Sequence, residues 1–451
     1  MSRALVNRLR ESRFRGNLSV KQQSASLSPE DTFRIVTKGP RMTVPEQLLA
    51  LAQLANVSSP SLTAVKVMAN RAAASSEQFY PPQIVESLTT FGKIGFSDSD
   101  ALLRLFESRM DDVLNEASPK RMVQLIEAFA NLEIPIASVW PEIRVALIRV
   151  IPQLKRGIPS VLKSLASMGC ADIELAHALL VQAECLLGET EASYFVQSIE
   201  AASRVDGMES AVAQALEVVS SSGHKATSVQ AVSLLTAALR VGHESARAFQ
   251  NQLNQALLSD SEAYAQSRLL VAMGRHGLST AHVGEVIERN MNDADFSQRM
   301  LPFVVYAGSL IGGADDVLRL VIHKQLDKAD RLSAEKLVDL TRAAVISGAD
   351  ASVTDELKAL LRPVGRQLSI RQQRLLWEVV PDSTPVACPG TVAEAVGPYS
   401  VRRVDDSTVS LRIPRYAVFR PGSTEIQRAI QLRVNAIQAS CGSQVVFSHS
   451  S

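Results

Sequence analysis

The stretch that decides the fold is Ser118–Glu133, which reads SPKRMVQLIEAFANLE. Ser-Pro is a typical helix start, because Ser can accept hydrogen bonds from the free amides of the first turn and Pro fits the first helical position. Apolar residues then recur at three- and four-residue steps: Met122, Leu125, Ile126, Phe129 and Leu132. This spacing places them on one face of a helix. The stretch therefore predicts an amphipathic helix that must bury one side against other helices.

Segments similar to this one recur along the chain. A related segment, LTTFGKIG at 88–95, lies 38 residues before its counterpart at Ile126. Glycines able to end a helix in the left-handed conformation recur in step with it: Gly95, Gly169, Gly207, Gly242, Gly277, Gly312 and Gly348. The last five steps are 38, 35, 35, 35 and 36 residues. Asn56 and Glu133 complete the series; Asn tolerates the left-handed conformation and Glu does not, so a different turn is expected at Glu133.

A large apolar residue stands about seven positions before each of these stops. The series is Leu49, Leu88, Ile126, Leu162, Ile199 (or the adjacent Glu200), Leu235, Leu270 and Val305, and the last unit has Thr341 instead. Glycines in phase with such a residue are typical of helix pairs that stack on their neighbours, because one pair is too small to bury its own apolar face. The predicted fold class is all-α, an α-solenoid of about nine 35–39-residue repeats over 43–380.

The flanking segments have a different composition. Residues 28–42 are predicted to be an irregular linker, and Thr43 to Glu46 a capping box that opens the first repeat. Residues 381–400 contain four prolines and two glycines, which indicates a linker. Strands are predicted at 408–413, 416–420 and 444–447, and a helix at 423–439. Residues 381–451 are therefore expected to form a small basic α/β cap, either a separate appendage or a β-augmented end of the solenoid.

Composition excludes several classes of protein. Hydrophobic residues make up 46% of the chain and aromatic residues 5%, which suits closely packed helices and argues against an all-β fold. The four cysteines form no CxxC pair, so neither a disulfide framework nor a zinc cluster is expected, and a reducing compartment is. No apolar run approaches the roughly 20 residues that cross a bilayer, so no membrane span is predicted.

The charge is unevenly distributed. Residues 1–21 carry six Lys or Arg against one acid, and residues 358–451 carry twelve against six. Because the whole chain is +1, the middle at 22–357 is about −10. The Arg-rich, nearly acid-free start is typical of a mitochondrial transit peptide, which we assign to residues 1–27, with the matrix as the predicted location. The alternative is a basic arm that touches RNA.

The sequence lacks the common motifs of catalytic, nucleotide-binding and metal sites. The sequence contains no P-loop, no dinucleotide-binding glycine motif, no H-E-x-x-H and no nucleophile elbow. The seven histidines show no metal-ligand spacing. We therefore expect a protein that is not an enzyme, with no catalytic residue, cofactor or metal site.

The candidate binding residues are basic. Lys120 and Arg121 lie in the first turn of the predicted helix, where the helix dipole does not favour cations, and Lys155, Arg156 and Lys163 follow one repeat later. A second group lies near the C-terminus: Arg362, Arg366, Arg371, Arg374, Arg402, Arg403, Arg412, Arg415 and Arg420. Arginines of this kind contact phosphates, and Tyr416 and Phe419 could stack on bases. The alternative is a solvated helix face, with charge that protects an edge strand from aggregation.

The phrases ESLTTFGKIGF (86–96) and IEAFANLEIP (126–135) resemble the degenerate helical repeats of octotricopeptide and RAP-associated proteins, which serve RNA in mitochondria and plastids. The resemblance covers about 43–380 and extends to the diverged repeat proteins of kinetoplastid mitochondria, found in RNA editing complexes or mitoribosomes. The C-terminal region lacks the acidic, endonuclease-like pattern of a RAP domain, so nuclease activity is not implied.

The resemblance implies a non-catalytic scaffold that binds or organises RNA, without sequence specificity, among the protein subunits of a mitochondrial ribonucleoprotein complex. The RNA would be guide RNA, pre-mRNA or rRNA. The alternative is a protein–protein adaptor, or a structural or assembly component of the mitoribosome, that makes no direct RNA contact; the acidic middle of the chain favours this alternative, because it repels nucleic acid.

Overall fold

The computed structural model describes residues 29–57, 60–95, 99–134, 136–170, 172–187, 192–259, 263–290, 300–364, 368, 370–380, 394–396, 399–405, 407–413 and 415–448. The predicted transit peptide at 1–27, Arg366 and most of the predicted linker at 381–400 lie outside these ranges.

The main body consists of two rows of helices. The inner row is α3 (Val44–Ala55), α5 (Pro81–Ile94), α8 (Pro119–Leu132), α10 (Ile158–Met168), α12 (Ala192–Ala202), α14 (Ser228–Val241), α16 (Ala263–Arg275), α18 (Leu301–Ile311) and α20 (Ala334–Ile346). Each helix of this row packs on the next one. The outer row is α2 (Pro29–Lys38), α4 (Leu62–Ala74), α6 (Ser99–Glu107), α7 (Met110–Glu116), α9 (Trp140–Val150), α11 (Ile173–Glu184), α13 (Glu209–Ser221), α15 (Ala246–Leu258), α17 (Val283–Asn290), α19 (Asp315–Leu326) and α21 (Ala351–Val364). Short 3-10 turns (η2 Gly39–Arg41, η3 Ser76–Gln78, η4 Ile151–Gln153, η5 Lys155–Gly157, η7 Ala329–Arg331) join some of them.

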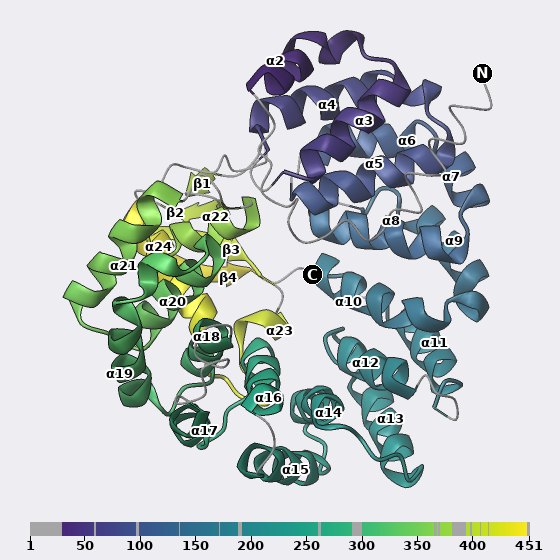
Figure 1. The fold of residues 1–451 in the computed structure, drawn as a ribbon. Coiled ribbons are helices and arrows are strands. Elements are labelled where there is room, and N and C mark those ends of the chain that lie inside the picture. Colours follow the sequence, from purple (N-terminus) through teal and green to yellow (C-terminus); the bar gives the residue numbers. More distant parts are fainter. Residues whose placement is uncertain are drawn as a thin grey trace.

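The two rows follow a curved path that nearly closes on itself, as Figure 1 shows. The path runs from α2 and α3 through α10 and α15 to α21, and the C-terminal domain lies within the curve. The protein is thus an all-α solenoid with a small α/β domain, and the predicted fold class is confirmed. Within the described ranges no helix has both the length and the apolar character that crossing a membrane requires.

The hydrophobic core runs along the solenoid between the repeats. Two clusters of buried residues divide it, one from Ile35 to Ala238 and one from Ala231 to Leu432. They meet on α14, where Leu234 belongs to the first cluster and Leu235 to the second. Each repeat is therefore stabilised by its neighbours rather than by a core of its own.

The predicted left-handed helix ends are confirmed at Gly95, Gly169 and Gly242, whereas Gly312 has ψ −179° and Gly207 lies five residues beyond the end of α12. All seven glycines named above adopt positive φ, from 66° at Gly169 to 86° at Gly207. The expectation of a different turn at Glu133 is wrong, because Glu133 also adopts the left-handed conformation, with φ 52°. The turn closes as the N–H of Ile134 donates to the carbonyl of Phe129 at 3.3 Å, and Ile134 is buried at 3% exposure. Closing the helix and burying Ile134 offset the strain of about 1 kcal/mol.

The first repeat departs from the predicted frame. The helix does end at Asn56, but Asn56 has right-handed geometry, with φ −90°. Leu49 is 61% exposed, whereas Leu51 is 1% exposed and lies 37 residues before its counterpart Leu88. The buried apolar residue of the first repeat is therefore Leu51 rather than Leu49. The other residues of that series, including Thr341, are buried.

The start of the solenoid also differs from expectation. The irregular linker predicted at 28–42 is wrong, because residues 29–38 form α2, which packs against α4. The capping box is confirmed: the N–H of Thr43 donates to Glu46 Oε2 at 2.8 Å. Ser118 stands at the start of α8, but its hydroxyl makes no capping bond, so Pro119 alone supplies the predicted start signal.

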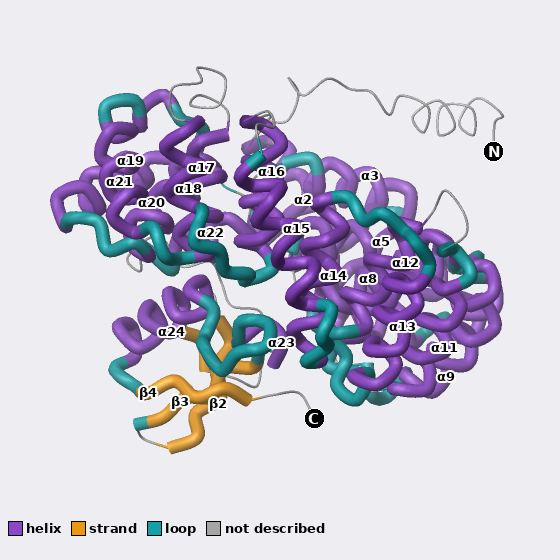
Figure 2. Tube along the Cα trace, turned by 90° about the horizontal axis from the view of Figure 1, so that it is seen from below, coloured by secondary structure: helices purple, strands orange, loops and turns teal. Residues whose placement is uncertain are grey.

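The C-terminal domain is built on a four-stranded sheet with the order β1-β2-β3-β4. Its strands are β1 (Glu394–Val396), β2 (Tyr399–Asp405), β3 (Thr408–Arg412) and β4 (Gln444–Ser448). The first three form an antiparallel meander, and β4 pairs in parallel with β3 after α24 (Arg428–Cys441). Figure 2 shows this sheet beside the helices rather than continuing their rows. The domain is therefore a separate appendage.

Several details of this domain were predicted wrongly. The predicted strand at 416–420 is instead a short helix, α23 (Arg415–Val418). A strand would point Tyr416 and Val418 to the same face, whereas Val418 enters the domain core and Tyr416 reaches the solenoid at Ser167. The helix predicted at 423–439 begins later, at Arg428, because the preceding residues form a turn closed by the Phe419–Ile426 bridge. The strands β3 and β4 are confirmed.

The end of the solenoid, α22 (Ile370–Trp377) and the residues that follow it, contacts both hydrophobic cores, because Leu376, Val379 and Val380 belong to the second solenoid cluster. Trp377 is packed in the core of the C-terminal domain together with Val401, Val409 and Leu411, and its ring meets that of Tyr399 edge-on, with centroids 5.9 Å apart.

Replacing Glu133 by glycine should stabilise the protein by about 0.5–1 kcal/mol, because glycine adopts the left-handed conformation without strain. The matched control is Glu127→Gly, which removes the same side chain from the helical interior of α8 and should destabilise by about 0.5–1 kcal/mol. Urea unfolding of both variants measures the difference. Equal destabilisation by the two variants would contradict the strain assigned to Glu133.

Candidate functional site

The C-terminal domain docks on the inner face of the solenoid through Arg428. Its guanidinium forms a bidentate ion pair with Asp315, at 2.7 and 2.9 Å, and donates to the carbonyl of Ser309 at 3.0 Å. These partners lie at the end of α18 and the start of α19. Two parallel charge-assisted bonds fix orientation as well as distance, so this contact sets how the domain sits.

Two neighbouring residues extend the contact. Arg420 donates to the carbonyl of Leu310 at 3.2 Å, and its side chain is only 11% exposed. Gly422 has φ +68°, and a Cβ at this position would lie 2.9 Å from the carbonyl oxygen of Leu239. The loop therefore approaches α14 as closely as only glycine allows.

A buried carboxylate forms a second anchor. Glu378, whose side chain has no exposed surface, accepts hydrogen bonds from Arg342 of α20 at 2.7 Å and from Arg433 of α24 at 2.9 Å. The hydroxyl of Tyr399 donates to the same carboxylate at 2.5 Å. One acid thus joins the solenoid to both the sheet and the helix of the C-terminal domain. Two arginines and a hydroxyl compensate its burial, which would otherwise be costly.

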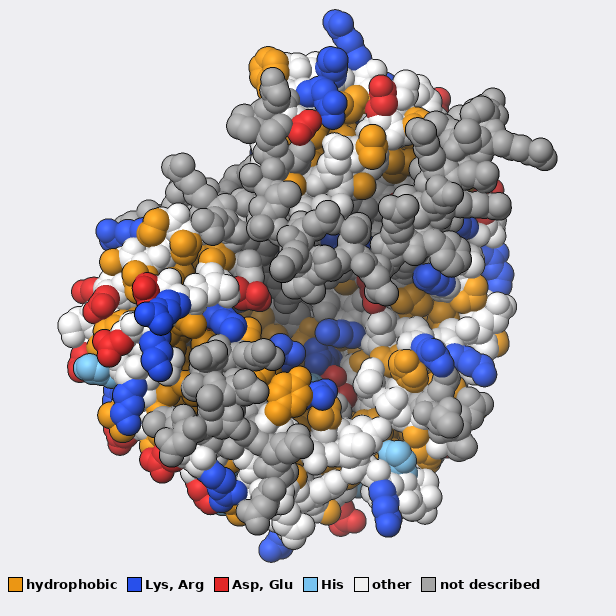
Figure 3. Space-filling view, in the orientation of Figure 1, with side chains coloured by type: hydrophobic (Ala, Val, Ile, Leu, Met, Phe, Trp, Pro, Cys, Tyr) orange, Lys and Arg blue, Asp and Glu red, His pale blue; other side chains and the backbone are white. Residues whose placement is uncertain are grey.

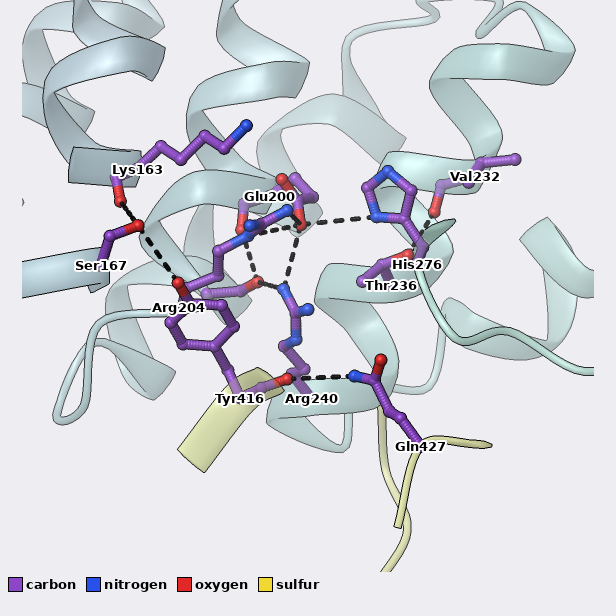
Figure 4. A network of polar contacts seen from close by, with 11 residues as sticks. Lys163, Ser167, Glu200, Arg204, Val232, Thr236, Arg240, His276, Tyr416 and Gln427 are labelled. Carbon is purple, nitrogen blue, oxygen red and sulfur yellow. Dashed lines mark hydrogen bonds and ion pairs between the residues drawn. The ribbon is translucent and has the colours of Figure 1, made fainter. Parts of the chain in front are cut away.

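A third group, which we call the inner cluster, consists of Glu200, Arg204, Arg240 and His276 (Figure 4). Arg204 donates to Glu200 Oε1 through Nε and Nη2, at 2.9 and 2.7 Å, and Arg240 donates to the same oxygen at 3.0 Å. His276 Nδ1 lies 3.5 Å from that oxygen. In Figure 3 several Lys and Arg side chains gather in the hollow at the centre of this face.

The electrostatics of the inner cluster keep Glu200 ionised. Burial by itself would raise the pKa of Glu200, but its interactions with His276, Arg204 and Arg240 outweigh this effect and hold the pKa far below its usual range. The cluster is therefore a carboxylate that carries a fixed pair of guanidiniums at neutral pH.

Tyr416 of α23 completes this site. Its ring lies 5.3 Å from the guanidinium carbon of Arg204 and 5.7 Å from that of Arg240, and its hydroxyl lies 3.3 Å from Ser167 Oγ on α10. An aromatic ring within about 6 Å of a guanidinium is attracted to it. The C-terminal domain therefore reaches three successive inner helices through one side chain.

A separate basic group, which we call the basic edge, consists of Lys120, Arg121, Lys155 and Arg156. Lys120 and Arg121 begin α8, and η5 packs against the same end of α8, since a Cβ on Gly157 would lie 2.6 Å from Val123 Cγ2. Within the described part of the chain Lys120, Arg121 and Lys155 have no acidic partner.

The basic edge has two further features that favour anions. The first-turn amides of α8 add positive potential to its cations. Arg156, which itself has a partner, also lies over the half-buried ring of Tyr194, with 5.8 Å from its guanidinium carbon to the centroid.

The predicted C-terminal arginines do not form one surface. Arg362 is exposed at the end of α21, and Arg374 is half-buried on α22. Arg403 is exposed on β2. The strand register pairs Arg402 with Ser410 and Arg412 with Ser448, while the side chains of Arg371, Arg402, Arg412 and Arg415 lie outside the description. Arg420 is held inside the molecule, so we remove it from the candidate RNA-binding residues.

The sequence analysis did not predict the inner cluster, although the spacing of its residues indicates it. Arg204, Arg240 and His276 are spaced by 36 and 36 residues, so they occupy the same place in three successive repeats. A polar residue that returns with the repeat period faces one common surface.

The described residues contain no group of three or more His, Cys, Asp or Glu side chains placed to hold a metal ion. Comparison with protein-family models and with curated proteins finds no match to this sequence. The fold and the site together define a class: a helical-repeat solenoid whose inner face holds its own C-terminal domain and whose edge carries Lys120, Arg121 and Lys155 without an acidic partner among the described residues.

The carboxyl group of Asp339 on α20 should make the stability of the protein depend on pH. Burial raises the pKa of Asp339 to about 6, and the charge of Arg342 offsets only part of this effect. The folded state therefore binds the proton more tightly than the unfolded chain, so the charge of Asp339 costs stability above about pH 6 but not below about pH 4. Asp339→Asn should stabilise by about 1 kcal/mol at pH 8 and change little at pH 4 in urea unfolding.

The control is Asp327→Asn at the exposed end of α19, which should stay within about 0.5 kcal/mol at both pH values. A stabilisation by Asp339→Asn of the same size at pH 4 and pH 8 would contradict the raised pKa of this carboxyl.

Proposed function

We propose that this chain is a non-catalytic, RNA-associated scaffold of a mitochondrial ribonucleoprotein complex. The observation that carries the proposal is the basic edge: two consecutive repeats bring four cations together at the amide end of α8, and three of them lack an acidic partner in the described chain. Groups of this kind neutralise phosphates. Tyr194 adds an aromatic ring on which a base can stack.

The contact is proposed to be independent of RNA sequence. Phosphate contacts carry no base information, and the repeats show no one-residue-per-base pattern. Arg402, Arg403, Arg412 and Arg415 remain candidates for a second phosphate contact on the C-terminal domain. The mitochondrial location is supported by the composition of residues 1–27 and by the resemblance of the repeats; guide RNA, pre-mRNA and rRNA are the RNA classes it suggests.

One observation favours protein partners as well. Large apolar side chains are exposed on two adjacent outer helices: Val145 and Ile148 on α9, at 68% and 44%, and Ile173 and Val181 on α11, at 46% and 51%. Val145 and Val181 lie 36 residues apart, one repeat. An apolar surface of this kind is typical of protein contacts, so the adaptor function is proposed as the second candidate, on the outer face.

Replacing Lys120, Arg121 and Lys155 together by alanine should weaken binding of a single-stranded 20-mer RNA at least about tenfold at 100 mM salt. Because about 0.7 counterions are released per phosphate contact on single strands, the slope of log K against log salt should fall by about 2. Fluorescence anisotropy over a salt series measures both quantities.

The matched control removes three exposed lysines elsewhere, Lys66, Lys324 and Lys328, and should leave RNA affinity within about twofold. Equal losses in the two triple variants would show that net charge, not the basic edge, governs binding. If native complexes keep all their protein partners after RNase treatment and the chain binds no RNA, the adaptor function is the correct one.

A further inference from the structure

We infer that Arg204 and Arg240 form a stacking site for a nucleobase of single-stranded RNA, and that Tyr416 of the chain's own C-terminal domain fills this site in the free protein. RNA and the docked domain then compete for the inner face. This inference rests on the proposed RNA association, but it concerns a site distant in sequence from the basic edge.

The two guanidiniums are held in place before any ring arrives. Arg204 bonds Glu200 through two nitrogens, and Arg240 bonds both Glu200 and Ser203 Oγ, at 3.0 and 3.1 Å. Glu200 is itself buried. Planar guanidiniums fixed at their edges leave their faces for stacking on an aromatic ring, and the ring of Tyr416 lies within 6 Å of both.

Tyr416 satisfies the shape of the site but not its charge. Lys163 and Ser167 lie one turn apart on α10, and Ser167 meets the Tyr416 hydroxyl (Figure 4). Lys163 is exposed and has no acidic partner within the described residues. Arg204 and Arg240 share the single carboxylate of Glu200, which leaves an excess of one positive charge that the neutral ring does not compensate. A nucleotide supplies both an aromatic ring and a phosphate.

The C-terminal domain stays anchored through Glu378 and Asp315, so only the segment that carries Tyr416 needs to leave the inner cluster. Its contacts with the inner face near this site are single side chains and one glycine, Gly422, whose close approach to Leu239 leaves no space for a Cβ. The domain also has its own hydrophobic core, which includes Val409 and Ile437. Tyr416 can therefore leave the inner cluster without loss of that core.

The test is binding of a fluorescein-labelled ten-nucleotide oligoadenylate to the full chain. Tyr416→Ala should bind it at least about fivefold more tightly than the wild type, because a vacated stacking site adds the favourable energy of one base. Adding Arg240→Ala to Tyr416→Ala should abolish this gain. Val446→Ala, on an exposed strand of the same domain, should leave the affinity within about twofold.

A second variant guards against misfolding as the explanation. Gly422→Ala keeps Tyr416 and every charge but presses the loop away from α14, and it should also tighten oligoadenylate binding. Near-ultraviolet circular dichroism checks that both variants remain folded. Inorganic polyphosphate, which has charge but no ring, should gain less than twofold in affinity for Tyr416→Ala.

The outcomes separate the two proposals. If Tyr416→Ala and Gly422→Ala gain no affinity while the basic-edge variant still weakens RNA binding, the stacking site is wrong and the RNA-associated function stands. An equal gain for polyphosphate would mean exposed charge rather than stacking, and a gain only for a neutral tyrosine-rich peptide would mean a protein ligand; either result overturns the inference. If no variant binds RNA, both proposals fail.

Discussion

The stacking of inner helices on one another is the constraint on which the rest of the structure depends. The ring of Phe106, from the outer row, meets that of Phe129 on α8 edge-on, with centroids 5.1 Å apart, so even the largest buried side chains are shared between repeats. On α14 two adjacent leucines serve two different hydrophobic clusters. Stability in such a chain is a sum of neighbour contacts, and its curvature follows from the small rotation of each repeat against the next.

The C-terminal domain supplies contacts that are not between neighbours. Ser167, Asp315 and Glu378 all bind it, although they belong to repeats far apart along the path. These bonds are polar and specific in direction, unlike the apolar contacts between repeats. The domain therefore ties distant repeats to one another and covers the inner cluster with Tyr416. The basic edge lies outside this arrangement.

Sequence periodicity predicted the solenoid well because glycine at φ > 0 and a buried apolar residue are local requirements repeated many times. The prediction failed at two helix ends. Glu133 adopts the strained left-handed conformation because the turn buries Ile134, and Asn56 ends a helix in the right-handed conformation. The basic character of the C-terminal region was predicted correctly. The sequence did not show which of its arginines form internal ion pairs and hydrogen bonds. Arg420 and Arg428 bind carbonyls and an acid more than 100 residues away in sequence, and no local pattern encodes such partners.

The docking of Tyr416 has a consequence for biosynthesis. Tyr416 follows Arg240 by 176 residues, and chains grow at about 5–20 residues per second. The guanidinium pair is therefore made roughly 10–35 seconds before the ring that covers it. During that interval the inner cluster of a nascent solenoid is not covered by Tyr416. The domain that covers the inner cluster is thus translated after the repeats that form it, which gives the order of synthesis a role in deciding what the inner face first meets.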